Sequence, residues 1–160
     1  MPTPDRLHYR NLPLLLLQAR EALMQHWRPA LRAHGLSDQQ WRVLRVLRAH
    51  AEGLETGRLA EQAFILGPSL TGMLARMEKS ALVTRQRSRE DARRSVVYAT
   101  AEGLRMADAL SASIVAQYED LARHLGQPSL EQLYALLDGL IALPAHPTTE
   151  GLAAEPALEK

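Results

Sequence analysis

The sequence predicts a mainly α-helical protein, with six helices and one small β-hairpin. Three observations lead to this fold class. Apolar residues recur at spacings of three and four along most of the chain. Ser37 and Ser129 are each followed three residues later by a glutamine, which is the capping-box pattern of a helix start. One segment, 82–99, is instead rich in β-branched and aromatic residues, as strands are.

The first predicted helix covers residues 13–34. Pro13 suits its first turn, where the missing N–H loses no helical hydrogen bond. Pro29 lies inside the pattern and is expected to bend or interrupt the helix near His26, and Gly35 is expected to end it. The large apolar residues of its stripe are Leu16, Leu23, Trp27 and Leu31.

Three shorter helices are predicted next, at 38–50, 56–64 and 67–80. The first begins at the Ser37 capping box and should bury Val43, Leu44 and Leu47. The second and third are joined by a tight glycine-containing turn, which is the helix-turn-helix pattern. The inward stripe of the third is predicted to be Leu70, Leu74, Met77 and Ala81.

A β-hairpin with strands at 82–87 and 95–99 follows the helix-turn-helix. Its connecting loop is polar, and the segment from Arg76 to Arg94 carries seven basic residues against three acidic. A helix-turn-helix followed directly by a basic hairpin is a winged helix-turn-helix. This combination indicates DNA binding, although a basic surface alone is more often simply solvated.

Two long helices are expected at the C-terminal side, at 100–125 and 129–143. Thr100 and the Ser129 capping box should begin them, and Pro144 should end the second. The apolar seam of the first is predicted to be Leu104, Ala107, Ile114, Tyr118, Leu121 and Leu125. Residues 144–160 have no periodicity and several prolines and glutamates, so a disordered tail is expected there.

Composition excludes several classes of function. The chain has no stretch of about 20 apolar residues that could span a membrane. Its 160 residues include no cysteine, and its histidines do not have the spacing of a zinc motif. Phosphate-binding loops and nucleophile motifs are missing too. We therefore expect a cytoplasmic protein that is not an enzyme, needs no metal or cofactor, and does not act at a membrane.

The helix at 67–80 is predicted to enter the DNA major groove. Gly72 is unfavourable in a helix interior by about 1 kcal/mol relative to alanine, and close approach to DNA would explain it. The alternative is an ordinary core helix that tolerates one glycine. The predicted contacts from this helix to bases and phosphates are Pro68, Ser69, Thr71, Gly72 and Arg76.

The hairpin is predicted to reach an adjacent minor groove, whose negative potential attracts arginine. The predicted contacts are Arg85, Arg89, Arg93 and Arg94. Asp91 is assigned an intramolecular role, since it could accept hydrogen bonds from Arg93 or a neighbouring arginine and so fix the shape of the loop.

These motifs resemble the MarR family of winged-helix repressors. The resemblance extends over residues 11–143 and rests on 58–60, 68–78, 82–85 and 91–93. The runs 15–21, 40–42 and 76–78 are most similar to regulators of homoprotocatechuate (hydroxyphenylacetate) degradation operons. Ala81 departs from the family, which usually has glycine before Leu-Val, and 99–103 departs from the usual opening of the long helix.

The resemblance implies a homodimer that binds a palindromic operator and is released by a small aromatic acid. Residues 11–35 and 101–143 would form the dimerisation helices, and 36–100 the DNA-binding region. Apolar stripes in excess of what a small winged-helix core can cover also favour a twofold dimer. The alternative is a monomer whose long helices fold back onto the core.

A ligand pocket is predicted where the first, second and fifth helices meet. Arg20 lies on the apolar stripe of the first helix and needs an acceptor. The acceptor is either a structural partner, such as Glu21 or an acid of the partner chain, or a ligand carboxylate. Tryptophans at helical spacing are more often core residues, yet they also form flat walls for an aromatic ring. The candidate ligand residues are Arg20, Met24, Trp27, Trp41 and Arg45.

Two other functions remain compatible with these residues. One is a DNA-binding protein of the same fold that responds to no effector. The other is a helical interaction protein whose basic hairpin binds an acidic protein partner, which would show no preference for an inverted repeat.

Overall fold

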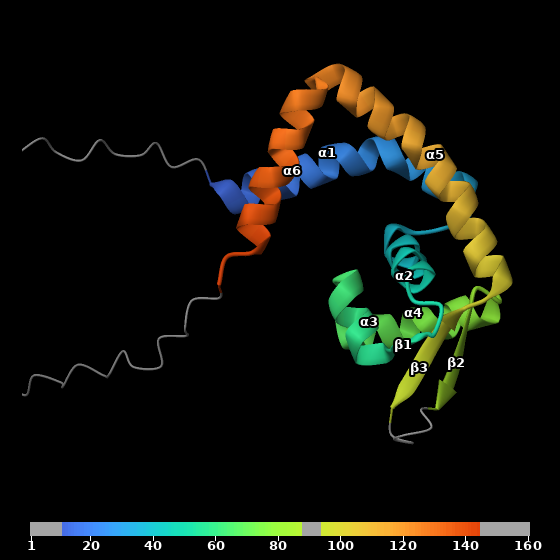
Figure 1. Ribbon diagram of the computed structural model, residues 1–160. Coiled ribbons are helices and arrows are strands. Elements are labelled where there is room, and N and C mark those ends of the chain that lie inside the picture. Colours follow the sequence, from blue (N-terminus) through green and yellow to red (C-terminus); the bar gives the residue numbers. More distant parts are fainter. Residues whose placement is uncertain (1–10, 88–93, 145–160) are drawn as a thin grey trace, which may run out of the picture. The chain divides into compact units, whose positions relative to one another are not determined.

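The computed structural model describes residues 11–87 and 94–144 of the chain. The chain divides into two compact units, Met1–Asp120 and Leu121–Lys160. Six helices and one small sheet confirm the predicted fold class (Figure 1). In chain order the elements are α1 (Leu12–Ala33), α2 (Asp38–Arg48), β1 (Leu54–Glu55), α3 (Thr56–Ala63), α4 (Gly67–Lys79), β2 (Val83–Arg87), β3 (Ser95–Ala99), α5 (Ala101–Leu125) and α6 (Gln127–Ile141).

The first unit is built around one hydrophobic core beneath the helix-turn-helix. The largest side chains that lose nearly all solvent contact come from α2, α3, α4, α5 and the sheet: Val43, Leu44, Leu47, Leu59, Leu70, Leu74, Met77, Leu110, Val83 and Val97. The inward residues predicted for α2 are confirmed. In α4, Met73 also turns inward, although the predicted stripe omitted it.

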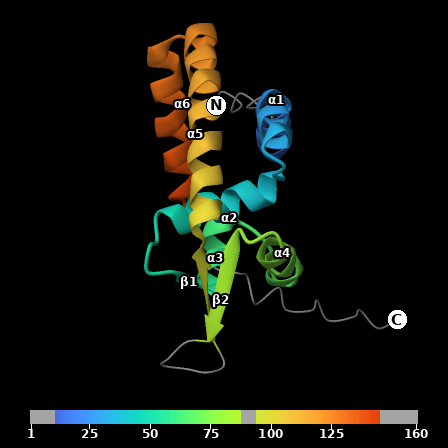
Figure 2. The ribbon, with the colours of Figure 1, turned by 90° about the vertical axis from the view of Figure 1, so that its right-hand side faces the viewer.

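The hairpin strands belong to a three-stranded antiparallel sheet in the order β1-β3-β2. Thr84 lies opposite Tyr98, and Leu54 of β1 lies opposite Val97. β1 was not predicted, because a strand of two residues is too short to show an alternating pattern. It forms because β3 offers it a free edge. Figure 2 shows β2 beside α4, the arrangement that places the hairpin next to the second helix of the helix-turn-helix.

α1 is one continuous helix, so of the predicted bend or interruption near His26, the interruption is wrong (Figure 1). A proline removes one backbone hydrogen bond, and here buried side chains on either side, Met24 and Leu31, hold the helix together. Asn11 begins the helix by accepting a hydrogen bond from the Leu14 N–H at 3.1 Å. Gly35 ends it as predicted, with a left-handed φ of 66°.

The capping box of α2 is confirmed, but that of α6 is wrong. Ser37 and Gln40 exchange both hydrogen bonds, at 2.9 and 3.2 Å. α6 begins two residues before Ser129, after Gly126, which supplies no side-chain cap. The φ of 82° at Gly126 turns the chain out of α5, and a proline in the first turn then starts α6.

Ala81 is exposed, so its predicted place in the inward stripe of α4 is also wrong. α4 has already ended, and Ala81 closes it with a left-handed φ of 55°. Leu82 takes the core position instead, and its N–H donates to the Met77 carbonyl at 2.9 Å. A left-handed conformation at this point favours glycine, the residue that the MarR resemblance led us to expect there.

The start of α5 is tightly packed against this turn. Thr100 caps the helix as predicted, since its Oγ accepts from the Gly103 N–H at 3.0 Å. The same hydroxyl donates to the Ala81 carbonyl at 2.6 Å. A Cβ on Gly103 would lie 2.1 Å from the Leu82 carbonyl oxygen, so only glycine fits. Within residues 11–87 and 94–144, none of the helices combines the length and apolar character that a membrane span needs.

Candidate nucleic-acid interface and ligand cavity

The outer face of α4 is exposed and made of small and polar side chains. Its exposed residues are Pro68, Ser69, Thr71, Gly72, Arg76 and Lys79. A Cβ on Gly72 would meet only the end of the Arg76 side chain, at 3.8 Å, so packing inside the protein does not require glycine there. The helix N-terminus has no side-chain cap at Leu66, which leaves its first N–H groups available to an anion such as phosphate. All five residues predicted to contact DNA from this helix are thus brought together on one accessible face.

The hairpin arginines differ in their surroundings. The Arg85 guanidinium donates to Oε2 of Glu78 from Nε, at 2.8 Å, and from Nη2. The Arg85 backbone N–H also donates to Glu78, at 3.1 Å. Hydrogen bonding to Arg85 holds the pKa of Glu78 below its ordinary value. Arg85 therefore braces β2 against α4 instead of projecting freely.

Arg94 is also paired, with Glu55 of β1, through two contacts of 3.1 Å. The other predicted hairpin residues, Arg89, Asp91 and Arg93, lie outside the described residues. So does the predicted disordered tail beyond residue 144.

Two adjoining cavities lie between α1, α2 and α5, all within the first compact unit. The larger has a volume of about 600 Å³ and the smaller about 190 Å³. Both are lined by Trp27, Trp41, Arg45 and Ile114. The smaller also contains Arg20 and Met24, so the structure brings together all five residues predicted to bind a ligand.

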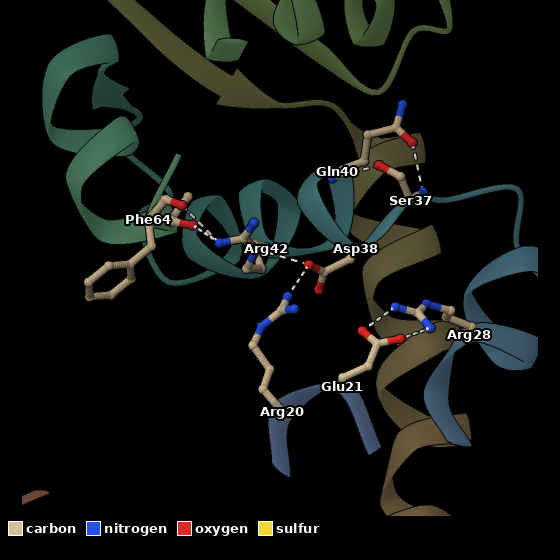
Figure 3. Close-up of polar contacts among 9 residues, drawn as sticks. Arg20, Glu21, Arg28, Ser37, Asp38, Gln40, Arg42 and Phe64 are labelled. Atoms are coloured by element: carbon tan, nitrogen blue, oxygen red, sulfur yellow. Dashed lines mark hydrogen bonds and ion pairs between the residues drawn. The ribbon is translucent and has the colours of Figure 1, made fainter. Parts of the chain in front are cut away.

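Arg20 is bound to Asp38 in α2, with Nη2 2.6 Å from Oδ2 (Figure 3). The predicted structural partner, Glu21, is wrong: it pairs with Arg28, through contacts of 2.6 and 2.7 Å. Arg28 lies two turns further along α1, on the same face as Glu21. The hydrogen bond from Arg28 lowers the pKa of Glu21. About half of the Arg20 side chain is exposed, so it is not the buried charge that the sequence suggested.

Among the arginines that line the cavities, Arg45 has no partner within the described residues. No ion pair or hydrogen bond to its side chain occurs within the part of the chain that the structure describes. The neighbouring Arg48 is instead paired with Asp108 of α5, at 2.7 Å. The free guanidinium sits in a cavity walled by aromatic rings, and the rings of Trp27 and Tyr118 lie 5.2 Å apart. A flat molecule with an anionic end matches this lining.

Several cavity residues were not predicted from the sequence, among them Tyr118, Ser111 and Asp38. Tyr118 and Ser111 come from α5, and Asp38 comes from the first turn of α2. Tyr118 had a signal, because it lies on the predicted apolar seam of α5 together with Ile114. Asp38 had none, since an acidic residue in a first helical turn is common. Among the described residues, acidic side chains and histidines do not gather into a group that could hold a metal ion.

Known proteins resemble this chain in sequence and in fold. Residues 34–94 match the MarR family. The chain is 38% identical over 133 residues to the homoprotocatechuate degradative operon repressor of Escherichia coli, across 83% of this chain and 89% of the relative. The structure of the transcriptional regulator PA4135 is similar with a TM-score of 0.81 and 41% identity, covering 86% of this chain and 100% of that one.

A second solved structure, NadR in complex with 4-hydroxyphenylacetate, is similar with a TM-score of 0.74 and 38% identity. The match covers 90% of this chain and 100% of NadR. These similarities confirm the resemblance that the sequence motifs indicated.

Proposed function

The chain belongs to the MarR family of transcriptional regulators, and we propose that it is a homodimeric repressor of an operon for aromatic-acid catabolism. An aromatic carboxylate, of the homoprotocatechuate or 4-hydroxyphenylacetate type, would release it from a palindromic operator. Members of the family regulate transcription and are not enzymes, which confirms the prediction of a non-enzymatic protein. The observation that carries the proposal is the aromatic cavity with its unpaired Arg45 in the same compact unit as the helix-turn-helix.

The exposed face of α4 supports the DNA-binding part of the proposal. Ser69, Thr71 and Arg76 would contact phosphates and base edges, and Gly72 would let the helix seat deeply in the major groove. Arg85 would contribute by holding the hairpin in place beside α4, through Glu78. Arg93 and Arg89 would reach the minor groove from the hairpin tip.

The cavity lining supports an aromatic carboxylate as effector. The ring would lie against Trp27, Trp41 and Tyr118, and the carboxylate would bind Arg45. The Asp38 carboxylate, in the smaller cavity, is an acceptor for a ring hydroxyl. A related protein has been solved with 4-hydroxyphenylacetate, which combines these three groups in one small molecule.

Exposed apolar residues in two helices support dimerisation. In α1, the first two turns expose Leu12, Leu14, Leu16 and Leu17. In α6, the large exposed residues are Leu133, Tyr134, Leu136, Leu140 and Ile141. Such apolar faces are typical of surfaces that are covered in an assembly. Light scattering should give the mass of a dimer at micromolar concentration, and a monomer mass would contradict this part of the proposal.

Fluorescence anisotropy on the duplex upstream of the protein's own gene tests the proposal. We expect tight binding that falls with salt, exceeds binding to a scrambled duplex, and weakens when 4-hydroxyphenylacetate is added. Binding that ignores the acid would contradict the effector and leave a constitutive DNA-binding protein. No preference over scrambled duplex, at this or other promoters, would favour an acidic protein partner instead.

A further inference from the structure

A chain of polar contacts leads from the smaller cavity to the turn of the helix-turn-helix (Figure 3). Arg20 of α1 binds Asp38 of α2, at 2.6 Å. Asp38 faces Arg42 one turn further along α2, and Arg42 reaches the end of α3. These contacts all lie within the first compact unit.

Arg42 holds the turn between α3 and α4. Its Nη1 donates to the carbonyl oxygens of Ala63 at 2.7 Å and of Phe64 at 2.9 Å. These are C-terminal carbonyls of α3, where a positive charge is favourable. Phe64 has a left-handed φ of 51° and lies three residues before α4 begins at Gly67. The guanidinium therefore fixes the backbone from which α4 starts.

Asp38 is shared unequally by the two arginines. Its Oδ2 lies 2.6 Å from Arg20 Nη2 but 3.5 Å from Arg42 Nε. Arg42 Nε is buried and has no hydrogen-bond partner within the described structure. A buried N–H without a partner is unfavourable. If Arg20 moves away, the Asp38 carboxylate can accept a hydrogen bond from Arg42 Nε, the nearby donor that has no acceptor.

We propose that Arg42 is a positioning residue for α4, and that Asp38 transmits the state of the cavity to it. A ligand hydroxyl that donates to Asp38 displaces Arg20 from it, and the Asp38 carboxylate then also accepts a hydrogen bond from Arg42 Nε. The guanidinium moves with this bond and loses its contacts to the carbonyls of Ala63 and Phe64. The turn before α4 loosens, and α4 fits the operator less well. This inference rests on the proposed function, because it describes how that effector site controls DNA binding.

Arg20→Met tests the proposal without any ligand, because it frees Asp38 while keeping a side chain of similar length. Arg20 lies outside α4 and the hairpin, yet we expect the operator Kd of this variant to rise about fivefold or more, the lower range of allosteric coupling. Backbone amides of residues 64–66 should exchange hydrogen faster. An operator Kd and exchange rates equal to those of the wild type would overturn the proposal.

Double variants separate this route from a general loss of structure. Arg20→Met combined with Asp38→Asn should bind the operator like Asp38→Asn alone, because the freed charge that acts on Arg42 is then missing. Fully additive effects would contradict the proposal. Arg105→Lys is the matched control, since Arg105 pairs with Glu102 on α5 at 2.6 Å, away from both cavities and the turn. Melting temperatures verify that each variant is folded.

The failure of the effector is a separate outcome. If 4-hydroxyphenylacetate leaves operator binding of the wild type unchanged, the proposed effector is wrong. The operator Kd of Arg20→Met, compared with that of the wild type, still tests whether Asp38 acts on Arg42, because this measurement is made without any acid.

Discussion

The corner between α4 and β2 and the cavity between α1, α2 and α5 are built in opposite ways. At the corner, Glu78 is bound by Arg85 through three hydrogen bonds, and Thr100 ties the turn to α5. In the cavity, Arg45 has open space of about 600 Å³ in front of it and no partner within the described structure. Both sites contain an arginine that the sequence assigned to an anion. A neighbouring carboxylate decides whether such an arginine can bind another anion. Arg85 is occupied by Glu78, whereas Arg45 remains available.

The strongest test of the rigid corner is Gly103→Ala. The new Cβ would overlap the Leu82 carbonyl oxygen, at 2.1 Å, so α5 or β2 must shift. We expect a loss of about 3 kcal/mol in the free energy of unfolding, the upper part of the usual range for overpacking. Urea denaturation measures it. Gly139→Ala in α6 is the control, because no atom lies within 4 Å of its added Cβ, and it should stabilise slightly.

Arg45→Ala tests the open cavity. Removing the unpaired guanidinium should weaken binding of 4-hydroxyphenylacetate by about 10- to 100-fold, equivalent to about 1.5–3 kcal/mol for a charged hydrogen-bonded contact. Isothermal titration calorimetry measures the affinity. Arg48→Ala is the matched comparison, since Arg48 lines the same cavity but is already paired with Asp108. An equal loss for both variants would remove the distinction between paired and unpaired arginines.

Glu78→Gln tests the ion pair of the corner through its pH dependence. Because Arg85 lowers the pKa of Glu78 in the folded state, the pair stabilises the protein above the carboxyl's ordinary pKa. That stability is lost as the pH falls through the lowered pKa. The pair is about one-third exposed, so we expect about 0.5–1 kcal/mol. Urea denaturation should show that the wild type loses this much more stability than Glu78→Gln between neutral and acidic pH, and parallel pH curves would contradict the pairing.

Ala81→Gly should have an effect no larger than that of Glu78→Gln, and of the opposite sign. Ala81 adopts a left-handed φ of 55°, which alanine tolerates poorly and glycine readily. The free energy of unfolding should rise by about 0.5–1 kcal/mol. Thermal unfolding at neutral pH measures the change. A decrease would mean that the turn is held by its hydrogen bonds to Thr100 and Met77 without residual strain.

Local signals predicted the helices well, and contacts between distant residues limited the rest. The Ser37 capping box spans four residues, so the start of α2 was readable from the sequence. The two-residue strand β1 exists only because it pairs with β3, which lies more than forty residues later in the sequence. Leu54 of β1 is paired with Val97 of β3. The left-handed turn at Ala81 depends on Thr100 and was therefore missed.

The candidate site shows the same division. Helical spacing placed Arg20, Met24 and Trp27 on one face of α1, and the cavity contains all three. The acceptor for Arg20 could not be predicted, because Asp38 is eighteen positions away and reaches Arg20 only through the packing of α1 on α2. The availability of Arg45 depends equally on which carboxylates lie near it in space.

The chain has only two tryptophans, and both line the cavity. Their emission therefore arises from one place in the molecule, next to Arg45, Tyr118 and the space that a ligand would fill. The unlabelled protein is consequently its own optical reporter: an aromatic acid that enters the cavity should quench or shift this emission, while one that binds elsewhere should not. A collection of candidate acids could be ranked in a fluorimeter before any operator sequence is known.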